Sequence, residues 1–125
     1  MSLLEGGGHI QIKVKNVDVT SILSLEGDFL GDDDHQKLRE QVSQLVKHGR
    51  MHLVVDLARV EHINSCGLGS LVCALTTVKR AGGEFQLAGV GVHVGDVLRL
   101  THLNTVFQIY PSVSATLSGY HVHDN

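Results

Sequence analysis

The chain has 125 residues, the size of one domain, of which 42% are hydrophobic and 18% are charged. This balance is typical of a globular protein and not of a disordered one. The net charge is −3 with neutral histidines, only 4% of the residues are aromatic, and the ten Lys and Arg residues are scattered. Because nucleic-acid binding needs a basic stripe or an aromatic stacking platform, the composition argues against nucleic acid as a direct partner.

The chain shows no membrane signal. Apolar stretches such as 51–55 are too short to cross a bilayer, and the N-terminus lacks a basic region followed by an apolar signal core. We interpret residues 1–8 as a flexible lead or a cloning scar, residues 9–120 as one domain and residues 121–125 as a polar tail.

The two cysteines indicate the compartment. Cys66 and Cys73 are seven residues apart in what we predict to be one helix, which separates them by about 10 Å along the axis. A disulfide tolerates only about 7 Å between Cα atoms. Free thiols indicate a reducing compartment, so we expect a cytoplasmic protein.

The first predicted elements are a hairpin and a helix. Residues 9–15 alternate apolar and polar side chains, as a half-buried strand does, and residues 19–25 form a second strand that we expect to pair with the first. The acidic residues of 31–34 suit a helix N-terminus. The helix that follows carries apolar residues at helical spacing, and Gly49 ends it; these residues are Leu38, Val42, Leu45 and Val46.

The central part of the chain predicts a strand, a helix and another strand. The near-continuous apolar run 51–57 is typical of a strand that is covered on both faces. Residues 81–83 stop a second helix, and residues 84–89 form the next strand. The second helix has apolar residues at helical spacing: Leu68, Leu71, Val72, Leu75 and Val78.

The C-terminal part predicts a third helix, an edge strand and a closing helix. The apolar positions of the third helix are Val94, Val97, Leu98 and Leu100. Residues 105–110 form the edge strand, and residues 111–117 form a short helix with Pro111 near its first turn. This alternation predicts an α/β domain with a mixed, mostly parallel sheet of four to five strands, flanked by about four helices.

The segment 64–70 is the most unusual in the chain, because it places two hydroxyls, a thiol and two glycines between a strand and a helix. Ser65 has two interpretations. A serine at a helix start is first of all an N-cap, whose oxygen accepts a hydrogen bond from an amide of the first turn. The same geometry also suits a phosphate, because a helix N-terminus exposes unsatisfied amides and a partial positive charge.

The segment from Leu53 to Leu71, LVVDLARVEHINSCGLGSL, resembles the signature of STAS domains, specifically the bacterial anti-sigma-factor antagonists. That signature is a hydrophobic strand ending in Asp-Leu, a short link, and Asp-Ser-Ser-Gly-Leu-Gly leading into a helix. The resemblance covers roughly residues 9–118. It continues in four further segments of the chain, LEGDF at 25–29, KRAGGEFQLAGV at 79–90, VLRLTHL at 97–103 and the strand at 107–110.

The resemblance implies a binding switch that is not an enzyme and needs no cofactor or metal. In the family, an anti-sigma factor with serine-kinase activity phosphorylates the serine that falls on Ser65, and a phosphatase of the PP2C type resets it. The unphosphorylated antagonist binds the anti-sigma factor and so frees the sigma factor. We expect a monomer or weak dimer whose partner surface contains Gly27, Asp28, Asn64, Ser65, Cys66, Gly67, Leu68 and Gly69.

Three positions depart from the family pattern. Asn64 stands where the family commonly has Asp, which keeps a capping oxygen but loses the charge. Cys66 stands where Ser or Thr is usual. Relatives often carry an Asp near the position of Leu30, and we expect one of the acidic residues at 32–34 to replace it.

Other chemistries fit the sequence less well. A hydrolase would combine Ser65 with His62 and Asp56, yet no Gly-x-Ser-x-Gly elbow surrounds Ser65. Glycines at 89, 91 and 95 are spaced one residue too long for a dinucleotide motif. The nine histidines are dispersed, and a pair in the tail such as His121 and His123 is more often solvated than bound to a metal. A helix N-terminus lowers thiol pKa values, which would make Cys66 a redox sensor, but no resolving cysteine lies within reach.

A second function remains open within the same superfamily. STAS domains also serve as stressosome scaffold units, as tails of anion transporters and as partners of lipid transporters. A stressosome-like scaffold would assemble into large particles, whereas a phosphorylation switch predicts a monomer or weak dimer.

Overall fold

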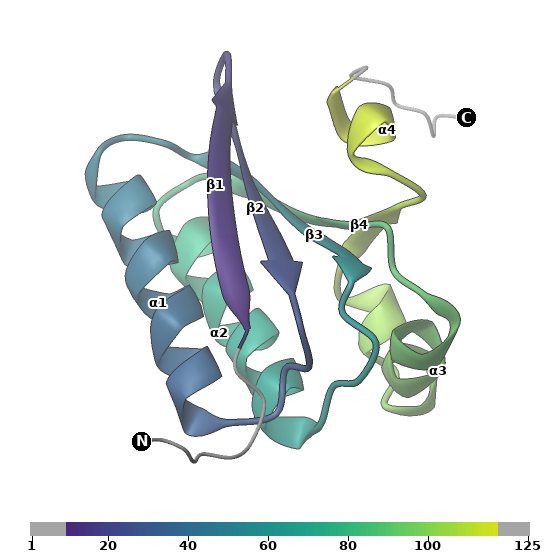
Figure 1. The fold of residues 1–125 in the computed structure, drawn as a ribbon. Helices are drawn as coiled ribbons and strands as arrows, with labels where there is room; N and C mark the ends of the chain where they lie inside the picture. The colour runs from purple at the N-terminus through teal and green to yellow at the C-terminus, as the bar shows by residue number, and fades with distance from the viewer. Residues whose placement is uncertain (1–9, 118–125) are drawn as a thin grey trace.

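The computed structural model describes residues 10–117, which form a five-stranded sheet with helices on both faces (Figure 1). β1 pairs with β2 antiparallel, and all other neighbours are parallel, so the predicted mixed, mostly parallel sheet is confirmed. The strands follow one another across the sheet in chain order as β1 (Gln11–Val17), β2 (Thr20–Glu26), β3 (His52–Arg59), β4 (Glu84–Ala88) and β5 (Gln108–Tyr110).

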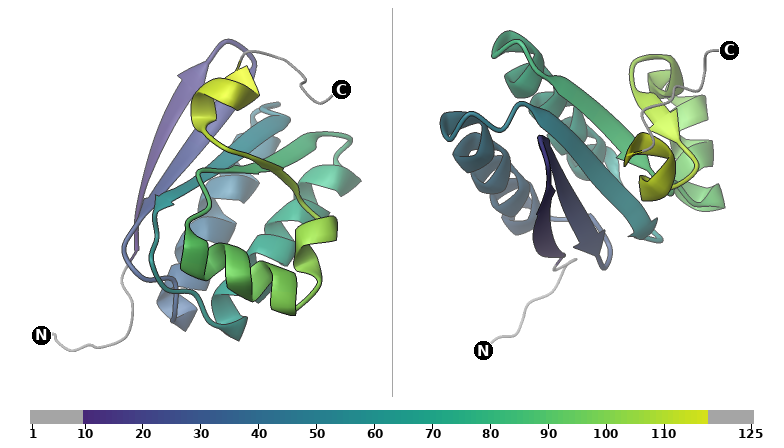
Figure 2. Two further views of the ribbon diagram at one scale, coloured as in Figure 1. Left: turned by 90° about the vertical axis from the view of Figure 1, so that its right-hand side faces the viewer. Right: turned by 90° about the horizontal axis from the view of Figure 1, so that it is seen from above.

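Three helices connect the parallel strands, and a fourth follows β5. The described helices are α1 (Asp32–Lys47), α2 (Ser65–Arg80), α3 (Val92–Leu100) and α4 (Val113–Leu117), with a short 3-10 turn, η2 (Leu103–Thr105), before β5. Because each crossover moves to the next strand in the same direction, right-handed connections place α1, α2 and α3 on one face. Figure 2 shows this layer of helices from two further sides. None of the described helices is long and apolar enough to span a membrane.

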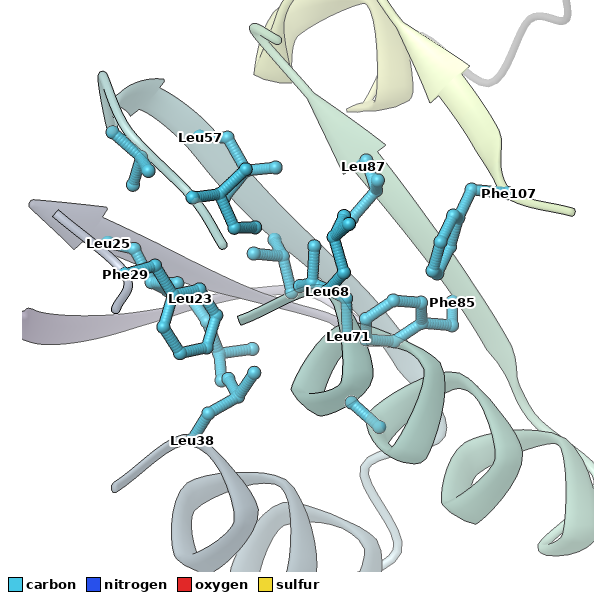
Figure 3. Close-up of a cluster of buried hydrophobic side chains, with 14 of the residues drawn as sticks. Leu23, Leu25, Phe29, Leu38, Leu57, Leu68, Leu71, Phe85, Leu87 and Phe107 are labelled. Carbon is cyan, nitrogen blue, oxygen red and sulfur yellow. The ribbon is translucent and has the colours of Figure 1, made fainter. Parts of the chain in front are cut away.

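The sheet buries side chains on both faces with a period of two. Leu53, Val55 and Leu57 of β3 point into the main core beneath α1, α2 and α3, where Leu68 and Leu71 of α2 pack at the centre (Figure 3). Val54 lies on the opposite face in a smaller cluster, against which Val113 packs. The prediction that 51–57 is a strand covered on both faces is therefore confirmed.

Two apolar positions are more exposed than the sequence suggests. Val14 is 37% exposed, because β1 is an edge strand. Leu100 is 77% exposed, although Val94 and Leu98 of the same helix are buried. Two residues correspond to a rotation of about 200° in a helix, so Leu100 lies opposite Leu98 and does not belong to the apolar stripe. The predicted lead at 1–8 and tail at 121–125 lie outside the described residues.

Asp34 is a structural anchor that the sequence pattern does not reveal. Its carboxylate is fully buried and accepts hydrogen bonds from the amides of Ile10 at 2.8 Å, Leu30 at 3.2 Å and Gly31 at 3.1 Å. Lys37, one turn further along α1, donates to the carbonyl of Ile10 at 3.0 Å. The first turn of α1 therefore holds both the start of β1 and the loop that precedes the helix.

We predict that Asp34→Asn lowers the free energy of unfolding by about 2–4 kcal/mol, because an amide group replaces an acceptor that faces buried N–H donors. Asp33→Asn is the matched control. Asp33 is an exposed neighbour in the same turn, and its replacement should cost less than about 1 kcal/mol of helix-dipole interaction. Urea unfolding followed by circular dichroism measures both. Equal losses in the two variants would show that the buried carboxylate has no special role.

Candidate functional site

The site is built on two loops that continue the pairing of β2 and β3 beyond the ends of both strands. The amide of Gly27 donates to the carbonyl of Arg59 at 3.2 Å, and the amide of Phe29 donates to the carbonyl of His62 at 2.9 Å. A parallel bridge then joins Phe29 to Ile63. This pairing brings the predicted positions 27–28 and 64–69 to the same end of the molecule, although they are far apart in the sequence.

Ser65 is exposed and is the first residue of α2. It is not the N-cap. That role belongs to Asn64, whose side-chain Oδ1 accepts a hydrogen bond from the amide of Gly67 at 3.1 Å. The hydroxyl of Ser65 makes no hydrogen bond with any residue in the described range 10–117. The capping interpretation of Ser65 is therefore wrong, and its hydroxyl is available to another molecule.

Asn64 also explains why an amide can replace the Asp of the family pattern. Its Nδ2 donates a hydrogen bond to the carbonyl of Leu30 at 2.9 Å, while its Oδ1 caps α2. A carboxylate can accept but cannot donate, so Asp at this position would cap the helix and leave the Leu30 carbonyl without this bond. The side chain of Asn64 thus ties the β2–α1 loop to the start of α2.

The predicted partner residues divide into surface and buried positions. Asn64, Ser65 and Gly69 are exposed, while Gly67 and Leu68 are buried. The buried pair can therefore shape the surface but offers little side-chain area to a partner. The remaining predicted positions are half-buried, namely Gly27, Asp28 and Cys66.

The structure requires glycine at two of these positions, Gly67 and Gly27, but not at Gly69. A Cβ on Gly67 would lie 2.5 Å from the carbonyl oxygen of Phe29 and 2.6 Å from Cγ1 of Ile63, so the helix can approach the two loops only with glycine there. Gly27 has φ of 111°, a backbone conformation that favours glycine. A Cβ on Gly69 would meet nothing within 4 Å, which agrees with a low, open surface beside Ser65.

The thiol of Cys66 behaves opposite to the expectation for a helix N-terminus. Desolvation, a hydrogen bond from Sγ to Oδ1 of Asp32 at 3.5 Å, and the negative charges of Asp32 and Asp34 together raise the pKa of the Cys66 thiol. A raised pKa lowers the thiolate fraction, which argues against Cys66 as a redox sensor. Cys66 and Cys73 are both free thiols.

Of the three acidic residues at 32–34, Asp32 is the one whose carboxylate contacts Cys66. It is exposed and faces Cys66 across the two loops, whereas Asp34 is buried beneath them. The carboxylate that faces the Ser65 loop therefore comes from the first turn of α1.

The geometry does not form a catalytic triad. His62 places Nδ1 3.1 Å from Oδ1 of Asp28, and it makes no hydrogen bond with Ser65. Asp56 accepts a hydrogen bond from the amide of Ala58 at 3.0 Å, the loop-bonding role expected for an acid at a strand end. The ring of His62 instead meets that of His93 edge-on, with centroids 5.2 Å apart.

The dinucleotide motif and the metal site find no support in the described residues. Gly89 has φ of 69° and donates its amide to the carbonyl of Tyr110 at 3.1 Å, so it is a turn glycine. Gly91 is the N-cap residue of α3. Within residues 10–117, no group of three or more His, Cys, Asp or Glu residues is placed to hold a metal ion, and the histidines at 121–123 lie outside this range.

Comparison with known proteins identifies the family. The STAS domain matches residues 11–116, and the chain therefore belongs to the STAS domain family. Its members of the anti-sigma-factor antagonist type are binding proteins and not enzymes. Two relatives provisionally named as anti-sigma factor antagonists are similar over most of their length. BtrV of Bordetella bronchiseptica is 22% identical over 89% of this chain and 95% of its own, and a Thermotoga maritima protein is 28% identical over 82% and 91%.

Solved structures agree with the fold. The crystal structure of a provisionally named anti-sigma factor antagonist from Thermotoga maritima has a TM-score of 0.78 and 28% identity, covering 86% of this chain and 92% of that one. SpoIIAA, an anti-sigma factor antagonist, shows the same fold in its unphosphorylated form, with a TM-score of 0.66, 12% identity and coverage of 90% and 100%. The phosphorylated form, from Bacillus, has a TM-score of 0.68, 14% identity and coverage of 88% and 97%.

The two glycines that flank Leu68 provide a matched pair of substitutions. We predict that Gly67→Ala destabilises the protein by about 1–3 kcal/mol, because the new methyl group overlaps the backbone of Phe29. Gly69→Ala should stabilise it by about 0.5–1 kcal/mol, because alanine favours a helix and the site is open. Thermal unfolding measures both. A tolerated Gly67→Ala would contradict the close approach of α2 to the loop.

Substitutions of Asn64 separate its two hydrogen bonds. Asn64→Ala removes both and should lower the free energy of unfolding by about 1–3 kcal/mol. Asn64→Asp keeps the cap but loses the hydrogen bond to Leu30. Its free energy of unfolding should therefore lie between those of the wild type and Asn64→Ala. Asn104→Asp serves as a control at an exposed position without a side-chain hydrogen bond to the described residues. An Asn64→Asp variant as unstable as Asn64→Ala would refute the capping role.

Proposed function

We propose that this protein is an anti-sigma factor antagonist in which Ser65 is the phosphorylation site of a binding switch. The observation that carries the proposal is the exposed hydroxyl of Ser65 at the first residue of α2, which makes no hydrogen bond with residues 10–117. The family match and the relatives named as anti-sigma factor antagonists support the kind of partner. The partner would be an anti-sigma factor with serine-kinase activity, and a PP2C-type phosphatase would reverse the modification in the cytoplasm.

The local charges fit a switch that acts on binding rather than on folding. A phosphate adds about −1.5 to −2 charges, and the N-terminus of α2 stabilises negative charge. Because the hydroxyl of Ser65 has no partner among the described residues, phosphorylation breaks no internal hydrogen bond. The existence of the same fold in phosphorylated and unphosphorylated SpoIIAA supports this view.

Release of the partner would then follow from desolvation and repulsion. A dianion buried in an interface without paired cations costs several kcal/mol, about tenfold in affinity for each 1.4 kcal/mol. Asp28 and Asp32 already lie on the same end of the molecule. Phosphate on Ser65 therefore adds to existing negative charge, and a partner that fits the unmodified surface closely would lose affinity.

Phosphorylation is tested by intact mass after incubation with ATP and the serine kinase encoded nearest the gene. We expect one added phosphate in the wild type and none in Ser65→Ala. Ser43→Ala, at an exposed position on α1, should accept phosphate as the wild type does. Both variants should keep the melting temperature of the wild type, because neither hydroxyl is bonded to the described residues.

Binding of the same kinase before and after modification completes the test. Binding of the unmodified protein and at least about a hundredfold weaker binding of the phosphorylated protein would support the switch. A chain that stays unmodified by a kinase active on another antagonist would refute it. Elution of that chain as a large particle on gel filtration would then favour the stressosome-like scaffold.

A further inference from the structure

A groove opens to solvent between α1 and α2, which lie side by side (Figure 1). Its volume is about 350 Å³, within the range of about 300–1,000 Å³ that is typical of small-molecule sites. Val42 and Ala74 form its buried floor, while Arg39, Cys73 and Thr77 are exposed along it. The groove therefore combines an apolar floor with a polar rim.

Each helix contributes one face to this groove. On α1, His35, Arg39 and Val42 are spaced by four and three residues, which places them on one stripe. On α2, Ser70, Ala74 and Thr77 follow the same spacing. Because two packed helices and not loops define the groove, its shape is fixed by the same contacts that hold the core.

The charge of the groove favours an anion. The guanidinium of Arg39 makes no hydrogen bond or ion pair with any residue between 10 and 117. Of the residues that the structure describes, those lining the groove include no carboxylate. Arginine is well suited to carboxylate and phosphate oxygens, because its planar N–H donors match their geometry.

His35 adds a second polar group to the groove. The hydroxyl of Ser70, which is buried, donates its one hydrogen to the carbonyl of Cys66 at 3.0 Å. A ring that donates through Nδ1 therefore fits the 2.5 Å contact with Oγ of Ser70. In that neutral tautomer Nε2 is an acceptor; it makes no hydrogen bond with the described residues and is open to a donor group of a ligand, but not to its anionic oxygens.

We infer that the groove between α1 and α2 binds a small organic anion, with a carboxylate or phosphate-monoester head against Arg39 and a short apolar chain over Val42 and Ala74. The head group supplies oxygen acceptors for the guanidinium of Arg39, which has none among the described residues. The apolar chain of the ligand covers the apolar floor between the helices. This site is distinct from Ser65, and the inference does not depend on phosphorylation of that residue.

The test is a titration of the full chain by two-dimensional ¹H–¹⁵N NMR with hexanoate and with hexyl phosphate. We expect amide shifts that concentrate on the facing stripes of α1 and α2, with dissociation constants in about the millimolar range or tighter. Binding of both probes defines an oxyanion site, and binding of only one identifies the head group. Hexanol tests the chain without the charge, while acetate and inorganic phosphate test the head without the chain; all three should bind at least about tenfold more weakly.

A matched pair of variants tests the role of Arg39. Arg39→Gln should weaken binding of the better probe by about tenfold or more, through loss of a charge-assisted hydrogen bond. Arg80→Gln removes the same charge from the exposed end of α2, outside the groove, and should change affinity by less than about twofold. Neither arginine has a described internal partner, so both variants should fold. Absence of groove shifts with either anion, hexanol binding as tight as hexanoate, or equal effects of the two variants would overturn the inference.

Discussion

The site depends on the parallel pairing of β2 and β3 and on its continuation through the loops that follow them. Backbone hydrogen bonds from Gly27 to Arg59 and from Phe29 to His62 carry this pairing to the start of α2. Because the two loops are bonded through their backbones, the side-chain hydrogen bond from Asn64 to Leu30 adds to a position that the backbone pairing already sets. The first turn of α2 then packs directly on this paired backbone at Gly67, where no side chain fits. An exposed serine on a rigid frame is the result.

At the start of α2, one residue caps the helix and the next one carries the exposed hydroxyl. Asn64 caps the helix and bonds to Leu30, while the hydroxyl of Ser65 has no hydrogen-bond partner in the part of the chain that the structure describes. A modification of Ser65 therefore leaves the cap intact. A carboxylate that faces this loop belongs to Asp32, in the first turn of α1, and desolvation together with this carboxylate raises the pKa of the Cys66 thiol.

Local patterns in the sequence predict the elements well, because strand and helix periodicities depend on which face is buried. The near-continuous apolar run 51–57 and the helical spacing of Leu68, Leu71 and Val78 lead directly to the central strand and to α2. The order of strand, short link and serine-glycine motif likewise predicts where Ser65 lies. These features are encoded within a few residues, so one sequence is sufficient to find them.

The features that sequence reasoning misses arise from contacts between distant residues. Asp34 looks like one of three acidic residues at a helix start, and only the fold brings it to the amide of Ile10, 24 residues away. The raised pKa of the Cys66 thiol likewise comes from desolvation in the fold and from Asp32, 34 residues away.

The groove between α1 and α2 is linked to the start of α2 through hydrogen bonds. His35 bonds to Ser70, and Ser70 bonds to the carbonyl of Cys66, the residue after Ser65. The apolar floor of the groove and the first turn of α2, which carries Ser65, are thus parts of one packed pair of helices. Since the backbone around Ser65 is fixed by the cap, by the loop pairing and by this chain of bonds, a phosphate there has little freedom to rearrange the fold. Its effect must be expressed at the surface, in what the protein binds.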